Sequence, residues 1–272
     1  MIVRRHFLAS LVALSACRRA KRAGIARRVV SISASTTEAL FAVGAGGLVV
    51  GRSKFCDHPK EALGLPVVGG FVDPSLEAVL ALEPDLVVGA RGPAGPGFSR
   101  TLEERGIATW FPETERIDDI FRMIEGIGAR TGHATDAAAL VERLRSERAT
   151  LVHEIAGRPK KRVLLLFSKK PITAAGPGSF PDEMLALAHA TNVVASGAAY
   201  PTLSLEQIVA FDPDLVLDAE MGGGALPVPS TFSVVRAVAE GRVRRLTEES
   251  VLRPGPRVID GARALVRAIH TA

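Results

Sequence analysis

Ser75-Leu-Glu-Ala-Val-Leu-Ala-Leu-Glu-Pro-Asp-Leu-Val-Val88 occurs a second time, with conservative changes, as Ser204-Leu-Glu-Gln-Ile-Val-Ala-Phe-Asp-Pro-Asp-Leu-Val-Leu217. Eight of the fourteen positions are identical, and about half of the 272-residue chain separates the two copies. Each copy has the pattern of a serine N-cap, a short amphipathic helix, a Pro-Asp turn and a buried strand. One such unit in each half predicts two lobes of similar construction, with the functional site in the cleft between them.

A long helix is predicted near the middle of the chain. Between Thr135 and Ala156 there is no glycine or proline, and leucines recur at helical spacing. At 1.5 Å per residue this helix is about 33 Å long. On both sides of it, short apolar strands alternate with helices, which predicts an α/β protein with parallel sheets. We divide the chain into a leader and short linker at 1–24, an N-terminal lobe at 25–132, a connecting helix at 133–157 and a C-terminal lobe at 158–272.

The first 24 residues have the features of an export signal. Arg4-Arg-His-Phe-Leu8 overlaps an apolar run over 7–16 that is too short to span a bilayer. Leu14-Ser-Ala-Cys17 resembles a bacterial lipoprotein box, in which Cys17 is lipidated, and the arginine pair resembles a twin-arginine (Tat) export signal. An apolar N-terminal helix of the fold is the alternative. We expect an exported lipoprotein, anchored to a membrane through Cys17 and facing the periplasm or the cell exterior.

Charge and cysteine content exclude two classes of protein. The chain has 34 lysine and arginine residues against 29 acidic ones, but six of the basic residues lie within 1–24, where no acidic residue occurs. The remainder is close to neutral, so the basic isoelectric point is no sign of a nucleic-acid partner. Beyond Cys17 only Cys56 remains, which excludes a framework of disulfide bonds.

Several motifs together resemble the substrate-binding lipoproteins of ATP-driven importers for cobalamin, ferric siderophores and haem. Besides both repeat copies, they are Arg28-Val-Val-Ser-Ile-Ser-Ala-Ser-Thr-Thr-Glu38, Phe55-Cys-Asp-His-Pro59, Leu65-Pro-Val-Val-Gly-Gly-Phe71 and Leu252-Arg-Pro-Gly-Pro-Arg257. The resemblance covers residues 27 to 271 and is closest to the cobalamin-binding branch. It implies two Rossmann-like lobes joined by one long helix, the architecture of class III periplasmic binding proteins.

The resemblance also implies a function. The protein would be a monomeric receptor that captures a metal chelate, either a cobalt corrinoid or a ferric chelate, in the cleft between the lobes. It would deliver the chelate to the permease and ATPase of an ATP-binding-cassette (ABC) importer, and it would use no cofactor and have no catalytic residue. A ferric-siderophore or haem receptor is the first alternative. An exported α/β enzyme is a distant one, since the chain has no Gly-x-Ser-x-Gly, Walker, G-x-G-x-x-G or His-Glu-x-x-His motif.

The repeat places one glutamate at the same position in each copy. Glu77 and Glu206 are both in the first turn of their predicted helices, where an acidic side chain interacts favourably with the helix dipole, by a few tenths of a kcal/mol. Since Leu76, Val79 and Leu80 form the apolar stripe of the first helix, Glu77 is expected to face solvent. In the resembling family, glutamates at these positions dock with arginines of the permease, one glutamate per lobe.

Ligand contacts are expected in loops at the carboxyl ends of strands, where open α/β sheets bind ligands. The candidates that match family contact positions or strand ends are His58, Tyr200, Arg253, Phe71 and Phe167. For three of them a plain structural role is the alternative. The histidine could be a surface imidazole, the tyrosine a core residue and the arginine a solvated side chain.

Other polar residues near these loops are not expected to hold a metal. Cys56-Asp-His58 is a run of consecutive loop residues, which rarely forms a closed tetrahedral site.

Ser35 and Thr36 are expected to begin and cap the first helix. Aromatic residues are few, with one tryptophan, one tyrosine and eleven phenylalanines, which leaves the identity of a large planar ligand open.

Overall fold

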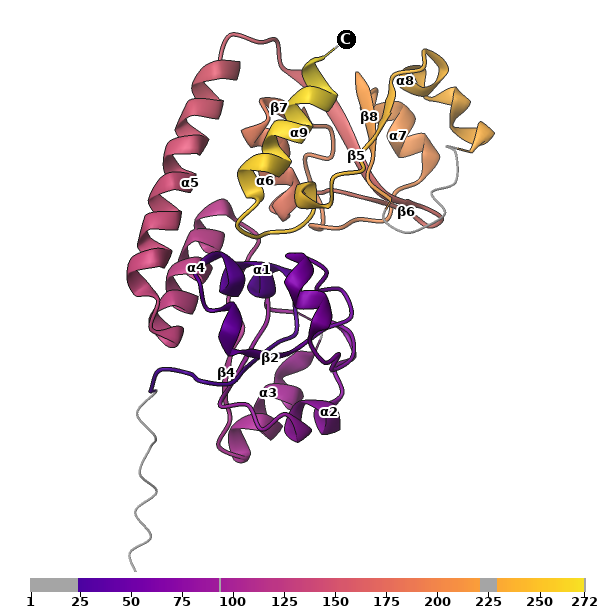
Figure 1. The fold of residues 1–272 in the computed structure, drawn as a ribbon. Coiled ribbons are helices and arrows are strands. Elements are labelled where there is room, and N and C mark those ends of the chain that lie inside the picture. The colour runs from indigo at the N-terminus through magenta and orange to yellow at the C-terminus, as the bar shows by residue number, and fades with distance from the viewer. Residues whose placement is uncertain (1–23, 93, 221–228, 272) are drawn as a thin grey trace, which may run out of the picture.

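The structure is a computed structural model that describes residues 24–92, 94–220 and 229–271. Apart from Gly24, the predicted leader, with its lipidation site Cys17, lies outside these residues. Figure 1 shows two lobes next to each other along the long helix α5 (Ala134–Ile155). Among the helices of the described residues, none has both the length and the apolar character required to cross a membrane.

The N-terminal lobe is built on a four-stranded parallel sheet in the order β2-β1-β3-β4. Its elements are β1 (Val29–Ser31), α1 (Ala34–Ala42), β2 (Val49–Arg52), α2 (Leu76–Ala81), β3 (Leu86–Val88), α3 (Gly95–Glu104), β4 (Ala108–Trp110) and α4 (Ile117–Thr131). Val30 and Val87 belong to an apolar cluster with residues of α2 and α3, whereas Val29 and Val88 share another with α1 and α4. Because helices cover both faces, the central strands are apolar on both sides.

The C-terminal lobe repeats this plan with one change. Its elements are β5 (Lys161–Lys169), β6 (Ile172–Ala174), α6 (Phe180–Leu187), β7 (Ala190–Asn192), α7 (Leu205–Phe211), β8 (Leu215–Asp218), α8 (Arg236–Ala239), β9 (Val243–Arg245) and α9 (Val258–His270). The order is β6-β5-β8-β9, with β7 also paired to β5. Strand β6 is antiparallel to β5, which differs from the expected wholly parallel sheet. Only Lys170 and Pro171 join these strands, and two residues are too few for the crossover that a parallel pair requires.

Helix α5 connects the lobes and packs on α4 of the first lobe and α9 of the second. Its buried residues belong to one apolar cluster that includes Val29 of β1 and Leu165 of β5, so the cluster continues from lobe to lobe. Helix α4, which contains Gly126 and Gly128, was not predicted from the sequence. A Cβ atom on Gly128 would lie 2.8 Å from the carbonyl oxygen of His133, and the glycine therefore permits a close turn into α5.

The two repeat copies fold alike. In α2 and α7 the hydroxyl of the preceding serine accepts a hydrogen bond from the third helical N–H, at 3.2 Å in both copies. Each Pro-Asp turn then holds the start of a central strand. Asp85 accepts from the N–H groups of Arg27 and Arg28, and Asp214 accepts from that of Arg162. The repeat is thus confirmed as one structural unit per lobe, and the predicted two-lobed α/β class is confirmed with it.

Candidate ligand-binding site

Three segments at the carboxyl ends of N-lobe strands contact the C-terminal lobe. Glu38 lies in α1, which follows β1; Asp57 lies in the loop after β2; and Glu115 lies between β4 and α4. Each carries a carboxylate that bonds to a group of the C-terminal lobe. The lobe interface therefore coincides with the edge of the sheet at which open α/β proteins bind ligands.

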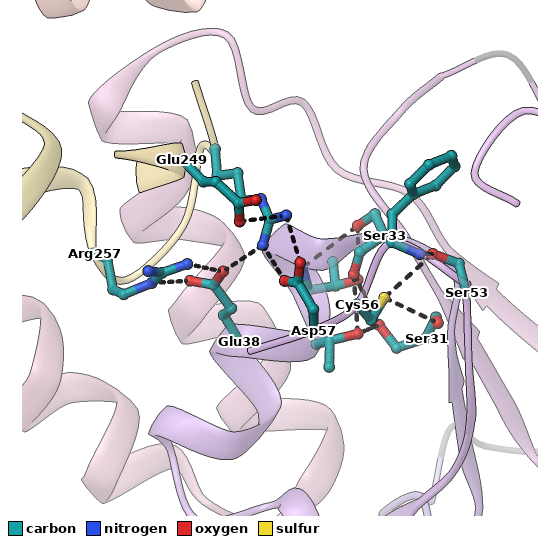
Figure 2. Close-up of polar contacts among 12 residues, drawn as sticks. Ser31, Ser33, Glu38, Ser53, Cys56, Asp57, Glu249 and Arg257 are labelled. Carbon is teal, nitrogen blue, oxygen red and sulfur yellow. Dashed lines mark hydrogen bonds and ion pairs between the residues drawn. The ribbon is translucent and has the colours of Figure 1, made fainter. Parts of the chain in front are cut away.

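A group of five charged residues, which we call the inter-lobe ionic cluster, occupies one end of this interface. Its members are Glu38, Asp57, Glu249, Arg253 and Arg257 (Figure 2). The two arginines and Glu249 come from the C-terminal lobe, the other two acids from the N-terminal lobe. With three carboxylates and two guanidinium groups, the cluster carries a net charge of −1 when all five are ionised.

Glu38 is the buried centre of the cluster. Its residue is 3% exposed, and its two oxygens accept hydrogen bonds from Arg257, at 2.9 Å from Nε and 2.6 Å from Nη2. Arg253 Nη1 lies 3.7 Å from the same carboxylate. Two parallel charge-assisted bonds of this kind fix both direction and distance. The hydrogen bond from Arg257 to Glu38 also raises the pKa of that arginine.

Arg253 is bound on both of its terminal nitrogens. Nη1 donates a short hydrogen bond to Asp57, and Nη2 lies 3.1 Å from the other oxygen of Asp57 and 2.7 Å from Glu249 Oε2. Its hydrogen bond to Asp57 lowers the pKa of that carboxyl group against the effect of partial burial. Burial by itself would lower the pKa of Arg253, but the surrounding carboxylates outweigh it and raise that pKa. The alternative of a solvated arginine is therefore wrong, because the side chain is 17% exposed and both of its terminal nitrogens are paired with carboxylates.

Buried polar residues lie beside the cluster. Cys56 is a free, buried thiol whose Sγ lies 3.3 Å from Ser53 Oγ, next to Ser31 (Figure 2). The N-cap of α1 is Ser33, which also accepts a hydrogen bond from the N–H of Ala90 at 2.9 Å. The expectation that Ser35 and Thr36 cap this helix is wrong by two to three residues. Ser33 is the N-cap because its hydroxyl accepts hydrogen bonds both from the N–H of Thr36 in α1 and from that of Ala90, just after β3.

An aromatic pair lies at another part of the interface. The rings of Phe167 and Tyr200 are 5.8 Å apart at an angle of 52°. Tyr200 donates to Glu115 Oε2 at 3.1 Å, and the N–H of Phe180 donates to the same oxygen at 2.8 Å. Burial and the nearby carboxylate raise the pKa of Tyr200. The residue is 48% exposed, so the alternative of a core tyrosine is wrong.

The remaining two candidates, Phe71 and His58, lie in different surroundings. The ring of Phe71 lies against Gly92, where a Cβ atom would come within 2.4 Å of it. His58 lines a pocket of about 420 Å³ together with Glu38 and Arg257, and both lobes contribute to that pocket. The structure thus brings the predicted residues Phe167 and Tyr200 together. Arg253 binds Asp57, the residue that precedes His58. In the described part of the chain, no cluster of three or more histidine, cysteine or acidic side chains could hold a metal ion.

The two glutamates of the repeat lie on the surface and take no part in the inter-lobe ionic cluster. Glu77 and Glu206 are both exposed in the first turns of α2 and α7. A hydrogen bond with Ser204 lowers the pKa of Glu206. Both side chains are therefore accessible to a partner.

Four members of the inter-lobe ionic cluster, and Glu115, were not predicted as site residues from the sequence. Glu38 and Arg257 lie at the ends of two quoted motifs, and Asp57 lies next to His58, but nothing in the sequence pairs residues 219 positions apart. A signal was present in the Arg-Pro-Gly-Pro-Arg spacing. Prolines restrict that loop, and two arginines on a restricted loop require acidic partners if they are not solvated.

Known proteins resemble this chain in sequence over most of its length. A family model described as periplasmic binding protein matches residues 29–249. The vitamin B12-binding protein of Salmonella typhimurium is 31% identical over 245 residues, which cover 90% of each chain. An uncharacterized ABC transporter substrate-binding lipoprotein of Bacillus subtilis, YvrC, is 28% identical and covers 90% of this chain and 80% of its own.

Two solved structures are similar over the same range. The vitamin B12 binding protein BtuF of Vibrio cholerae matches with a TM-score of 0.80 and 25% identity, covering 90% of this chain and 96% of that one. A periplasmic haem-binding protein from Pseudomonas aeruginosa matches with a TM-score of 0.81 and 26% identity, covering 91% and 94%. The chain belongs to the periplasmic binding protein family.

Proposed function

We propose that this protein is the extracytoplasmic receptor of an ABC importer and captures a corrinoid, most simply cobalamin, between its lobes. The observation that carries the proposal is the meeting of polar and aromatic groups from both lobes at the carboxyl ends of the two sheets. Tyr200 and Phe167 offer ring faces there, and the inter-lobe ionic cluster offers hydrogen-bonding groups. The similarity to vitamin B12-binding proteins over nine-tenths of both chains supports the corrinoid as the ligand.

A haem or ferric-siderophore receptor is the second candidate. The similarity to a haem-binding protein, with a TM-score of 0.81, favours it. The five predicted ligand residues His58, Tyr200, Arg253, Phe71 and Phe167 serve either ligand class. No turnover of the chelate is proposed, and the ligand is cargo and not a cofactor.

Docking to the permease is proposed for Glu77 and Glu206. They occupy equivalent positions in two equivalent units, and both side chains are exposed. A membrane partner with two basic patches would thereby contact each lobe once, and the complex would also include the ATPase of the importer. We further propose that the receptor is a monomer, exported by the twin-arginine route and held by a lipid on Cys17 at the periplasmic or outer face of a membrane.

Titration calorimetry of the purified protein with cyanocobalamin, haem and a ferric siderophore tests the ligand. Sub-micromolar binding of cyanocobalamin, recovered chemically unchanged, is expected. Binding of haem or the siderophore without cyanocobalamin would replace the corrinoid by the second candidate, and a changed ligand would reveal an enzyme.

Uptake measurements test the docking residues. Glu77→Ala combined with Glu206→Ala is expected to abolish uptake while the affinity for ligand stays within about threefold, since the glutamates lie outside the lobe interface. Glu142→Ala, an exposed glutamate of α5, is the matched control and should leave uptake unchanged. A loss of ligand affinity in the double variant would instead place the glutamates in the ligand site.

A further inference from the structure

A pocket of about 300 Å³ lies at the end of the C-terminal lobe that is remote from the lobe interface. It is formed by the amino ends of β5, β8 and β9 and by the last turn of α9, whose end lies far from the N-terminal lobe (Figure 1). Its charged lining residues are Lys161, Asp214, Arg242 and Arg244, and Leu215 and Ile269 belong to its apolar wall. Because the proposed ligand cleft lies at the carboxyl ends of the strands, this pocket is separate from that cleft.

The residues that line this pocket, together with their charged partners, carry more positive than negative charge. The five basic residues are Lys161, Arg162, Arg236, Arg242 and Arg244, and the three acidic ones are Asp212, Asp214 and Glu240. When all are ionised, the net charge is +2. Since residues 25–272 as a whole are close to neutral, positive charge is concentrated at this pocket. Such a concentration attracts anions.

Two of the acidic residues are already paired with arginines. Asp214 accepts a hydrogen bond from the N–H of Arg162 at 2.9 Å, and its other oxygen lies 3.8 Å from Arg236 Nη2. Asp212 accepts two hydrogen bonds from Arg236, at 2.8 and 3.0 Å. An anion that enters the pocket therefore meets carboxylates whose charge is already compensated.

Two of the basic lining residues have N–H groups left for a ligand. Lys161 donates one N–H to the carbonyl oxygen of Ile269 at 2.5 Å, and an ammonium group has three. Arg244 is exposed, and its hydrogen bonds to Gly241 and Val243 within the described residues use Nη1 alone. A guanidinium group has five N–H bonds, so Arg244 can donate further bonds to a ligand.

Arg242 provides the observation that points to a ligand. Its Nε and Nη2 atoms are buried, and neither has a hydrogen-bond partner among the described residues. Nη2 lies 2.5 Å from Glu240 Oε2, but this ion pair lacks the geometry of a hydrogen bond. Buried donors are nearly always hydrogen-bonded, and each exception costs free energy. Nε and Nη2 form the same edge of the guanidinium group through which Arg257 binds Glu38 with two bonds.

We propose that this pocket binds a phosphate dianion, either free phosphate or the phosphate group of a monoester. The side chain of Arg242 is 33% exposed and can turn away from Glu240, which brings its unpaired edge to two phosphate oxygens. Lys161 and Arg244 bind the remaining oxygens, and the apolar wall of the pocket contacts the carbon atoms of a monoester. The net charge of +2 matches a phosphate dianion better than a carboxylate. This binding goes beyond the proposed receptor function and does not depend on the ligand of the cleft.

Calorimetric titration of the purified protein with inorganic phosphate and with phenyl phosphate tests the site. At a mildly alkaline pH and constant ionic strength, saturable binding of both is expected, and acetate, a monoanion, should bind at least about tenfold more weakly. Arg242→Met and Arg244→Met should each weaken phosphate binding about tenfold or more, since each removes charged hydrogen bonds. Arg143→Met, at an exposed arginine of α5, is the matched control and should change the affinity less than about twofold.

Thermal melts provide a second measurement, because a ligand that binds only the folded protein raises its melting temperature. Phosphate should raise the melting temperature of the wild type and of Arg143→Met more than that of Arg242→Met. The proposal is overturned if neither phosphate compound binds saturably, or if both pocket variants bind as tightly as the wild type. Acetate binding as tight as phosphate binding also overturns it. Binding of phenyl phosphate without inorganic phosphate supports the site and identifies a monoester as its ligand.

Discussion

Replacing Glu38 by glutamine measures how much the buried carboxylate at the lobe interface contributes to the free energy of unfolding. The substitution keeps the shape of a residue that is 3% exposed, but it removes the charge that holds Arg257 at 2.9 and 2.6 Å and Arg253 at 3.7 Å. Removing one partner of a buried pair costs about 3 to 5 kcal/mol. The side chains of Arg257 and Arg253 are 29% and 17% exposed and regain some hydration, so we expect a loss of about 2 kcal/mol in the free energy of unfolding.

Urea unfolding followed by circular dichroism provides the measurement. Asp212→Asn is the matched control, because Asp212 also binds an arginine through two bonds, to Arg236 at 2.8 and 3.0 Å, but on an exposed surface. The control should leave the midpoint unchanged. Equal shifts in the two variants would refute the reasoning, since burial would then have no part in the effect. A double-mutant cycle with Arg257→Met should give a coupling energy of at least about 1 kcal/mol.

Three further predictions concern single contacts. Gly261→Ala would place a Cβ atom 2.4 Å from the carbonyl oxygen of Ser250, and we expect a loss of about 2 kcal/mol in thermal melts, whereas Gly157→Ala meets no atom within 4 Å and should be harmless. Burial lowers the pKa of His270, so the unfolded chain takes up a proton first as pH falls below about 6.5 and stability decreases from there towards the lower native pKa. Unfolding curves at several pH values should show this decrease, and its persistence in His270→Gln would contradict the assignment. Tyr200→Phe keeps the ring and should change cyanocobalamin affinity less than about threefold, whereas Tyr200→Ala should weaken it about tenfold; equal effects would point to the hydroxyl group.

The architecture was predictable because it depends on local patterns. Serine caps, apolar spacing and Pro-Asp turns are written within a few residues of one another, and the two copies at Ser75 and Ser204 confirmed each other. Helix α4 was missed because its glycines weaken the helical signal, although Gly126 makes room for Trp110 and Gly128 for the start of α5. The antiparallel β6 was missed because a two-residue connection reverses a strand that otherwise resembles its parallel neighbours.

The site was predictable only in part, and the reason is the range of its contacts. Glu77 and Glu206 could be recognised as exposed from helix periodicity alone. The pairing of Arg253 with Asp57 could not be recognised, since Asp57 is 196 positions away and the pairing depends on how the lobes meet. The ligand contacts of the five candidate residues therefore remain predictions, whereas the structure shows the contacts that these residues make within the protein.

The continuous apolar cluster through α5 has a kinetic consequence. Because one buried apolar cluster supports both lobes, we expect the lobes to stay close to their present spacing and ligand capture to involve little rearrangement. Association of such a preformed site is expected to be limited by orientation, at about 10⁵ to 10⁷ M⁻¹s⁻¹, whatever the chelate. Ligands that fit well and ligands that fit poorly would then enter at similar rates and differ in residence time, so the permease receives whichever ligand is still bound when the receptor reaches it.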